Sequence, residues 1–228
     1  MKRRCLNCSD ADTEDMMYKA ALFDLDGTLL DSSYVWHRVD EIFFERRGMQ
    51  VPEDYAKAIS GMGYAATARY TKERFDLPES PEEIAGEWTA IAMEEYAMRV
   101  PLKPGSREAL DELLKSGVRL CVVTSNHRDL CKPCLSRLGI LDKFEFLLTT
   151  DEAGSATKRD GAIYALAAAK MGVDAEDCAV FEDTCEGITG AKKRGMYAYC
   201  VIDAHTTRDI ETIRSIANGC SENILDLI

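Results

Sequence analysis

Short apolar runs alternate with longer amphipathic segments along much of the chain. The apolar runs have the length of strands and cover residues 20–23, 118–123, 144–148, 178–181 and 196–202. The segments between them predict helices over 106–116, 127–138 and 157–171, then up to Arg194 and again near the C-terminus. Strands that alternate with helices pair in parallel, so the pattern predicts an α/β protein whose parallel sheet is covered by helices on both faces.

One long stretch, residues 33–100, shows helical periodicity and no convincing strand. Four helices are expected there, beginning near residues 35, 52, 64 and 81. The fourth has a complete start signal, with Ser80 as N-cap, Pro81 at the first helical position and Glu83 as the capping-box residue. The predicted organisation is a mobile extension over 1–18, an α/β core over 19–32 and 101–228, and an inserted all-helical cap over 33–100.

Polar residues with catalytic chemistry follow three of the predicted strands. Asp24 and Asp26 follow the first, Thr124 the second, and Glu182 and Asp183 the fourth. Ligands of open parallel sheets bind beyond the carboxyl ends of the strands. We therefore expect these side chains to converge on one crevice.

The segment Asp24-Leu25-Asp26-Gly27-Thr28 carries the strongest local signal. Period two along a strand places both aspartates on the same side, and neighbouring carboxylates need a compensating charge. Mg²⁺ supplies such a charge and prefers oxygen ligands. Gly27 permits a sharp turn, to which the Thr28 hydroxyl can bond. We interpret the segment as catalytic; the alternative is an acidic strand end on the surface.

Two further segments are suited to binding a phosphate group. The Thr124 hydroxyl and the backbone N–H groups of Ser125 and Asn126 can hold phosphate oxygens, although an ordinary N-cap has the same residues. Lys158 follows Thr157 and is expected in the first turn of a helix. The helix dipole disfavours a cation there, which indicates a role beyond helix stability, although a solvated surface lysine is equally compatible with the spacing. Glu182 and Asp183 could hold a cation or form a solvated acidic loop.

The formal charge of −12 and the pI near 4.8 argue against nucleic-acid binding, which depends on Lys and Arg. A small phosphorylated substrate would need local positive charge at the site. No apolar run has the length of a membrane span, and the N-terminus lacks the apolar region of a signal peptide. We expect a cytoplasmic monomer that acts on a small molecule.

The chain has nine cysteines, an odd number, which suits reduced thiols packed as small apolar residues. Two pairs, Cys5/Cys8 and Cys131/Cys134, have the spacing of zinc ligands. They are far apart in the sequence and no histidine cluster accompanies them, so we interpret both pairs as structural or incidental.

Taken together, the motifs resemble the haloacid dehalogenase (HAD) superfamily, in its β-phosphoglucomutase-like and phosphatase branch with a small helical cap. The matching motifs are, in order, Asp24-Leu25-Asp26-Gly27-Thr28, Thr124-Ser125, Lys158, and Glu182-Asp183-Thr184 with Gly187. The resemblance covers nearly everything after residue 18 and implies a Rossmann-like core. The sequence departs from the branch just after Lys158, where prolines are common and 159–161 are Arg-Asp-Gly.

The resemblance implies a phosphatase that forms an aspartyl-phosphate. Asp24 would attack phosphorus, and Asp26 would protonate the leaving oxygen and later deprotonate water. Mg²⁺ would be held by Asp24, the carbonyl of Asp26 and Asp183, with Glu182 nearby. Residues Thr124, Ser125 and Lys158 would stabilise the transferring group, while the cap opens for substrate and closes to exclude water.

The same resemblance leaves two other functions open. A phosphomutase would use the same core, and a non-catalytic phosphoacceptor module is a third reading that needs neither the cap nor Asp26. Mutases of this branch carry a histidine at the position of Trp36 in the first cap helix, where a tryptophan cannot titrate. Trp36 could line the substrate pocket or pack inside the cap, and the adjacent His37 should face elsewhere.

Overall fold

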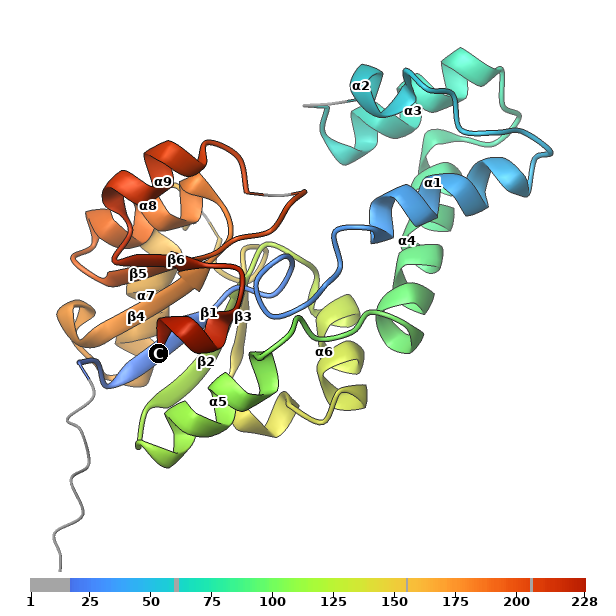
Figure 1. Cartoon of the computed structure of the whole chain (residues 1–228). Coiled ribbons are helices and arrows are strands. Elements are labelled where there is room, and N and C mark those ends of the chain that lie inside the picture. The colour runs from blue at the N-terminus through green and yellow to red at the C-terminus, as the bar shows by residue number, and fades with distance from the viewer. Residues whose placement is uncertain (1–16, 60–61, 155, 206) are drawn as a thin grey trace, which may run out of the picture.

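The computed structural model describes residues 17–59, 62–154, 156–205 and 207–228, and these form a six-stranded sheet with an attached helical unit. The strands are β1 (Ala20–Phe23), β2 (Arg119–Thr124), β3 (Leu147–Thr149), β4 (Cys178–Glu182), β5 (Tyr197–Val201) and β6 (Gly219–Ser221). Their order is β3-β2-β1-β4-β5-β6, and every neighbouring pair is parallel (Figure 1). The predicted α/β fold with a parallel sheet is confirmed.

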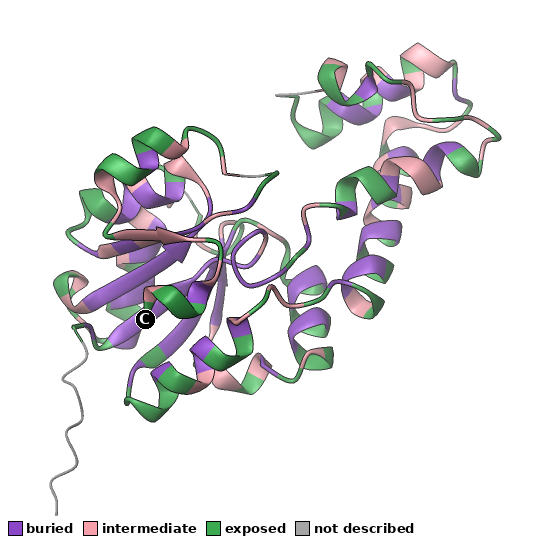
Figure 2. Cartoon of the chain, viewed as in Figure 1, coloured by how far each residue is buried: buried purple, intermediate pink, exposed green. Residues whose placement is uncertain are grey.

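Helices cover both faces of this sheet. They are α5 (Ser106–Lys115), α6 (Arg128–Arg137), α7 (Ala162–Met171), α8 (Cys185–Lys193) and α9 (Ile210–Ile216). Along β1, Ala21 and Phe23 pack in the cluster that contains α5 and α6, whereas Ala20 and Leu22 pack in the cluster that contains α7, α8 and α9. All four are fully buried, as a central parallel strand requires (Figure 2). The end of β1 is thus held rigidly at the middle of the molecule.

The described part of residues 33–100 contains helices and no strand. These are α1 (Val35–Glu45), α2 (Tyr55–Ile59), α3 (Tyr64–Phe75) and α4 (Pro81–Met98), and they stand to one side of the sheet (Figure 1). Phe44 anchors their core, with its ring 5.1 Å from that of Tyr55 and 4.9 Å from that of Phe75. The predicted capping box is present, since Ser80 Oγ accepts from the Glu83 N–H and the Glu83 carboxylate accepts from the Ser80 N–H.

The cap is tied to the core at its two connecting segments and at the end of α4. The Asp31 N–H donates to the Pro101 carbonyl at 3.0 Å, so the outgoing and returning chains lie side by side. The last turns of α4 pack against α6, and the Arg137 guanidinium donates to the carbonyl oxygens of Tyr96 and Val100. The C-terminal end of α4 is therefore fixed to the core.

The sheet differs from the prediction in two places. The third strand begins at Leu147 rather than at Phe144, because a 3₁₀ turn (η1, Leu141–Lys143) delays the extended chain. Residues 145 and 146 already bond to β2, but regular pairing begins only at Leu147. Strand β6 was not predicted, because Gly219-Cys220-Ser221 is short and has no alternating apolar pattern.

The helix predicted from Thr157 begins only at Ala162. Thr157 and Asp160 do interact, with the Thr157 hydroxyl donating to the Asp160 carboxylate at 2.9 Å. They close a turn, however, and Gly161 follows with a φ of +72°, which an α-helix cannot continue through. Lys158 thus lies in a loop before α7 and not in a first helical turn.

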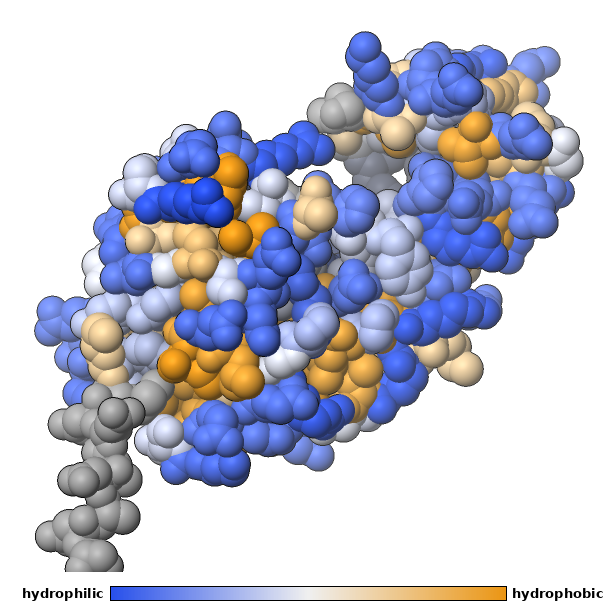
Figure 3. All heavy atoms as spheres, viewed as in Figure 1, coloured by the Kyte–Doolittle hydropathy of each residue, from blue (hydrophilic) through white to orange (hydrophobic). Residues whose placement is uncertain are grey.

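Tyr18, which the sequence placed in the extension, is buried against the aromatic rings of Phe181, Tyr197 and Tyr199 and belongs with the core. Residues 1–16, including Cys5 and Cys8, lie outside the described residues. On the face shown in Figure 3, hydrophilic residues predominate and apolar ones form separate patches. No helix in the described part of the chain combines the length and apolar character needed to cross a bilayer.

Candidate active site

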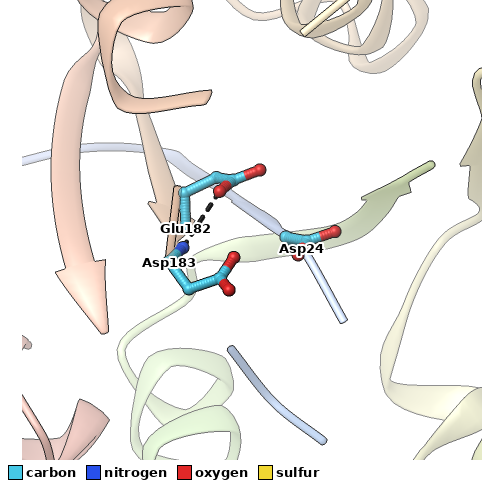
Figure 4. A group of neighbouring side chains, drawn as sticks. All are labelled: Asp24, Glu182 and Asp183. Carbon is cyan, nitrogen blue, oxygen red and sulfur yellow. Dashed lines mark hydrogen bonds between the residues drawn. The ribbon is translucent and has the colours of Figure 1, made fainter. Parts of the chain in front are cut away.

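Polar side chains from three strands lie together at the carboxyl edge of the sheet. Asp24 follows β1, Thr124 ends β2, and Glu182 ends β4 with Asp183 after it. Because β1 lies between β2 and β4, all four line one cavity of about 480 Å³, together with Lys158. Figure 4 shows the three carboxylates gathered at this edge. The structure thus brings together the residues that the sequence assigned to one crevice.

Asp24 is buried and ion-paired. It is 5% exposed, and Lys158 Nζ lies 2.6 Å from its Oδ1. Burial raises the pKa of the Asp24 carboxyl above its usual range, the Lys158 ammonium opposes this rise, and the carboxylates of Glu182 and Asp26 add to it. Burial alone would lower the pKa of Lys158, but the two carboxylates beside it outweigh burial and raise that pKa instead. Lys158 therefore stays a cation and helps keep Asp24 ionised.

Glu182 organises the wall opposite Asp24. It is fully buried, and its Oε1 accepts hydrogen bonds from Lys158 Nζ at 2.5 Å and the Tyr164 hydroxyl at 3.2 Å. Its Oε2 accepts from the N–H groups of Asp183 and Thr184 and from the Thr184 hydroxyl, at 2.8–2.9 Å. Both oxygens are engaged by neighbouring donors, so Glu182 fixes the lysine and the Asp183 loop at once.

Helix α8 approaches this wall so closely that two of its residues must be glycine. A Cβ on Gly187 would lie 2.3 Å from Cδ of Glu182, and a Cβ on Gly190 would lie 1.8 Å from the backbone carbonyl oxygen of Lys158. These distances explain the glycine of the fourth motif. They also show that α8 lies directly against the Lys158 loop, a contact that no sequence pattern indicated.

Asp26 is held by three donors. Its Oδ1 accepts from the hydroxyls of Tyr96 at 2.5 Å and Ser32 at 2.6 Å, and its Oδ2 accepts from the Asn126 side-chain amide at 2.9 Å. The sequence analysis missed Tyr96 and Ser32. Tyr96 falls on the apolar face of a cap helix and carries no motif, so only the folded chain reveals its contact with Asp26.

The loop after β2 is ordered by its own hydrogen bonds. Thr124 is buried, and its Oγ1 accepts from the Asn126 N–H at 3.1 Å, while Asn126 Oδ1 accepts from the His127 N–H at 2.8 Å. The Asn126 N–H, expected to face a phosphate, is therefore engaged within the loop, and the Asn126 side chain contacts Asp26 instead. The Thr124 hydroxyl proton and Ser125 remain suited to a phosphate in the cavity that both residues line.

A second cavity, of about 450 Å³, lies between the core and the cap and shares Asp26, Ser125 and Asn126 with the first. Trp36 is 46% exposed on its wall, with its ring 5.9 Å from that of Tyr64. Of the two placements open to Trp36, the structure shows the one that lines the pocket. His37 does not line the cavity, and its Nε2 lies 3.3 Å from Glu41 on the surface of α1.

The carboxylates of Asp24, Glu182 and Asp183 each offer an oxygen within 4.8 Å of the others, which is the donor chemistry that Mg²⁺ selects. Within the described residues this is the one such cluster of potential ligands. Cys131 and Cys134 are buried in α6, and burial raises the pKa of the Cys134 thiol to about 11. Such a thiol is protonated near neutral pH, which agrees with a structural role for this pair.

Comparison with known proteins identifies the family. A family model described as haloacid dehalogenase-like hydrolase matches residues 18–195. The chain belongs to the haloacid dehalogenase-like hydrolases. It is 32% identical to the validoxylamine A 7'-phosphate phosphatase of Streptomyces hygroscopicus subsp. limoneus over 86% of this chain and 90% of the relative. It is 25% identical to the hexitol phosphatase B of Escherichia coli (strain K12), over 80% and 82% of the two chains.

Solved HAD structures share the fold. A protein from Thermotoga maritima that carries a provisional assignment as a β-phosphoglucomutase superposes with a TM-score of 0.81 at 24% identity, over 92% of this chain and 97% of that one. This likeness extends across both the sheet and the cap. The resemblance read from the motifs is confirmed at the level of family and fold.

Proposed function

We propose that this HAD hydrolase is a phosphatase that removes the phosphoryl group from a small hydroxylated metabolite. The observation that carries the proposal is the position of Asp26, which lies where the two cavities meet. The first cavity, with Asp24, Lys158 and Thr124, suits a phosphoryl group, and the second suits the rest of the substrate. The scissile P–O bond would then cross the boundary beside Asp26.

In the proposed reaction, a carboxylate oxygen of Asp24 forms a bond to phosphorus as the bond to the leaving oxygen breaks. Asp26 gives its proton to that oxygen, so the product leaves as a neutral alcohol. Asp26 then takes a proton from water as the water oxygen bonds to phosphorus, and inorganic phosphate departs while Asp24 is regenerated. Lys158 and the Thr124 hydroxyl, which both line the first cavity, would stabilise negative charge on the phosphoryl oxygens.

Asp24 and Asp183, with the carbonyl of Asp26, would hold a Mg²⁺ ion, and Glu182 would support them through its contacts with Lys158 and the Asp183 loop. When bound, the ion supplies positive charge that offsets the repulsion between Asp24 and an anionic phosphoryl group.

The lining of the second cavity suggests the chemistry of the substrate. Its described residues offer hydroxyl groups from Ser33 and Thr89 and aromatic rings from Trp36 and Tyr64, and none of them is Lys or Arg. Such a wall suits a neutral ring or chain that carries hydroxyl groups, and it offers no Lys or Arg to a second phosphate or a carboxylate. His127 also lines it, and the Nδ1 of His127 lies 2.7 Å from Asp151. The names of the two phosphatase relatives refer to validoxylamine A 7'-phosphate and to hexitols, and the hexitols belong to this class.

A phosphomutase is the second candidate, because the fold is shared with that branch. Trp36 stands where the mutases of this branch carry a histidine, and its indole cannot titrate. We therefore expect water to attack the aspartyl-phosphate, so that hydrolysis is faster than transfer of the phosphoryl group back to a sugar.

A panel of phosphorylated polyols, sugars and nucleosides with Mg²⁺, followed by phosphorus NMR, tests the proposal. We expect inorganic phosphate to accumulate from uncharged hydroxylated compounds, and bisphosphates and phosphorylated carboxylic acids to react more slowly. An isomeric phosphoester that accumulates without inorganic phosphate would establish the mutase instead. No reaction with any compound would refute both.

A further inference from the structure

The cap contributes to the core site through a buried tyrosine. Tyr96, on α4, is 1% exposed, and its hydroxyl reaches across to Asp26 Oδ1 at 2.5 Å, which Ser32 also contacts at 2.6 Å. Burial and the neighbouring Asp26 raise the pKa of Tyr96 above its usual range, so its hydroxyl acts as a donor at any working pH. Neither Tyr96 nor Ser32 belongs to the motifs that identify the family.

The two oxygens of Asp26 are thereby made unequal. Oδ1 accepts two short hydrogen bonds and has little room for a proton of its own, whereas Oδ2 accepts one bond, from Asn126. When the proton of the carboxylic acid is on Oδ2, Oδ1 remains a carbonyl-type acceptor, and the hydroxyls of Tyr96 and Ser32 can still donate to it. The same arrangement fits the ionised carboxylate, so neither donor has to move during proton transfer.

The position of Tyr96 is fixed from the core side. Arg137 of α6 donates to the Tyr96 carbonyl at 3.2 Å, and α4 packs against α6 along its last turns. The tyrosine is therefore held by the part of α4 that is anchored to the core and not by the distant end of the cap.

We propose that Tyr96 and Ser32 are positioning residues that fix the Asp26 carboxyl so that Oδ2 carries the proton given to the leaving group. This inference rests on the proposed function, and it concerns only the proton that Asp26 delivers. It predicts that loss of either hydroxyl impairs reactions whose leaving group needs a proton and spares those whose leaving group does not.

The test compares two substrates for the wild-type enzyme and the variants Tyr96→Phe and Ser32→Ala. One substrate is 4-nitrophenyl phosphate, whose phenolate leaves without a proton, and the other is an alkyl phosphate from the panel. The value of kcat/KM covers the steps up to departure of the alcohol. We expect it to fall about 10- to 100-fold for the alkyl phosphate, which is part of the ~10²–10⁴ that general acid catalysis contributes, and to change less than about threefold for the aryl phosphate.

Tyr55→Phe is the matched control. Tyr55 is also a fully buried cap tyrosine, and its hydroxyl bonds to Thr71 at 2.7 Å, away from both cavities. It should lower stability and leave the ratio between the two substrates unchanged. If Tyr96→Phe does not fold, Ser32→Ala reports on the same oxygen.

An equal fall for both substrates, or no fall for either, would overturn the inference while leaving the phosphatase proposal intact. Wild-type enzyme that releases phosphate from neither compound would refute the proposed function, and this inference with it.

Discussion

The substitution Gly190→Ala tests whether α8 sets the position of Lys158. Gly190 lies within α8, where alanine would normally be favoured by about 1 kcal/mol. Here the added methyl group would lie 1.8 Å from the backbone carbonyl oxygen of Lys158 and 2.9 Å from the Gly161 nitrogen. Both are backbone atoms, so no side-chain rotation relieves the overlap. The Lys158 loop must retreat by more than an ångström.

Two effects follow from that displacement. Overpacking costs about 1–3 kcal/mol, which cancels or exceeds the gain in helix propensity. In the wild-type protein the Lys158 ammonium lies 2.6 Å from Asp24. In the variant it is displaced from the phosphoryl site, and a misplacement of about 1 Å can lower the rate ~10²-fold. We therefore expect Gly190→Ala to lower kcat/KM about 100-fold, with a melting temperature equal to or a few degrees below that of the wild type.

Gly86→Ala provides the control for the assay. Gly86 lies within α4, and a Cβ there meets no atom within 4 Å, so the same change should raise the melting temperature by about 2–4 °C and leave activity unchanged. Thermal unfolding and phosphate release are measured on both variants. If the Gly190→Ala variant is as active as the wild type, or is stabilised as much as the Gly86→Ala variant, α8 does not set the position of Lys158.

Three further predictions concern single charges. Lys158→Met leaves Asp24 and Glu182 buried without their shared cation, so urea unfolding in EDTA should show a loss of about 3–5 kcal/mol, and an unchanged midpoint would contradict the ion pairing. Asp183→Asn should raise the Mg²⁺ concentration for half-maximal activity by at least about tenfold, and an unchanged titration would place the metal elsewhere. Burial raises the pKa of Asp40 to about 6 against an opposing effect of His37, whereas the same carboxyl in the unfolded chain has a pKa of about 3.9. The stability cost of ionising Asp40 therefore grows between about pH 4 and pH 6, is complete above pH 6 and is largely absent at pH 4. Asp40→Asn should therefore stabilise the protein by about 1 kcal/mol at pH 8, with a much smaller gain at pH 4, and an equal gain at both values would contradict that assignment.

Much of the core could be predicted because each element depends on its own residues. The run at β1 is apolar at every position, which only a strand buried on both faces requires, and the break into Asp24 marks its end. The position of the site then follows from topology, since carboxyl ends of parallel strands share one edge. The capping box at Ser80 was predictable for the same local reason.

The remainder depends on contacts between distant segments. The bond from Tyr96 to Asp26 joins residues 70 positions apart, and nothing around Tyr96 distinguishes it from other buried positions of α4. The loop that carries Lys158 has the sequence of a helix start, but Gly161 and the close approach of Gly190 stop the helix there. Strand β6 exists only because β5 offers it an edge.

Covalent capture of the reaction tests the central claim most directly. Wild-type enzyme is mixed with Mg²⁺ and a substrate from the panel and quenched in acid within one turnover, and its peptides are then analysed by mass spectrometry. The account predicts one phosphoryl group on the peptide that contains Asp24, and neither this adduct nor phosphate release from folded Asp24→Asn protein. Phosphate released by that variant at the wild-type rate, or a phosphoryl group on another residue, would contradict it.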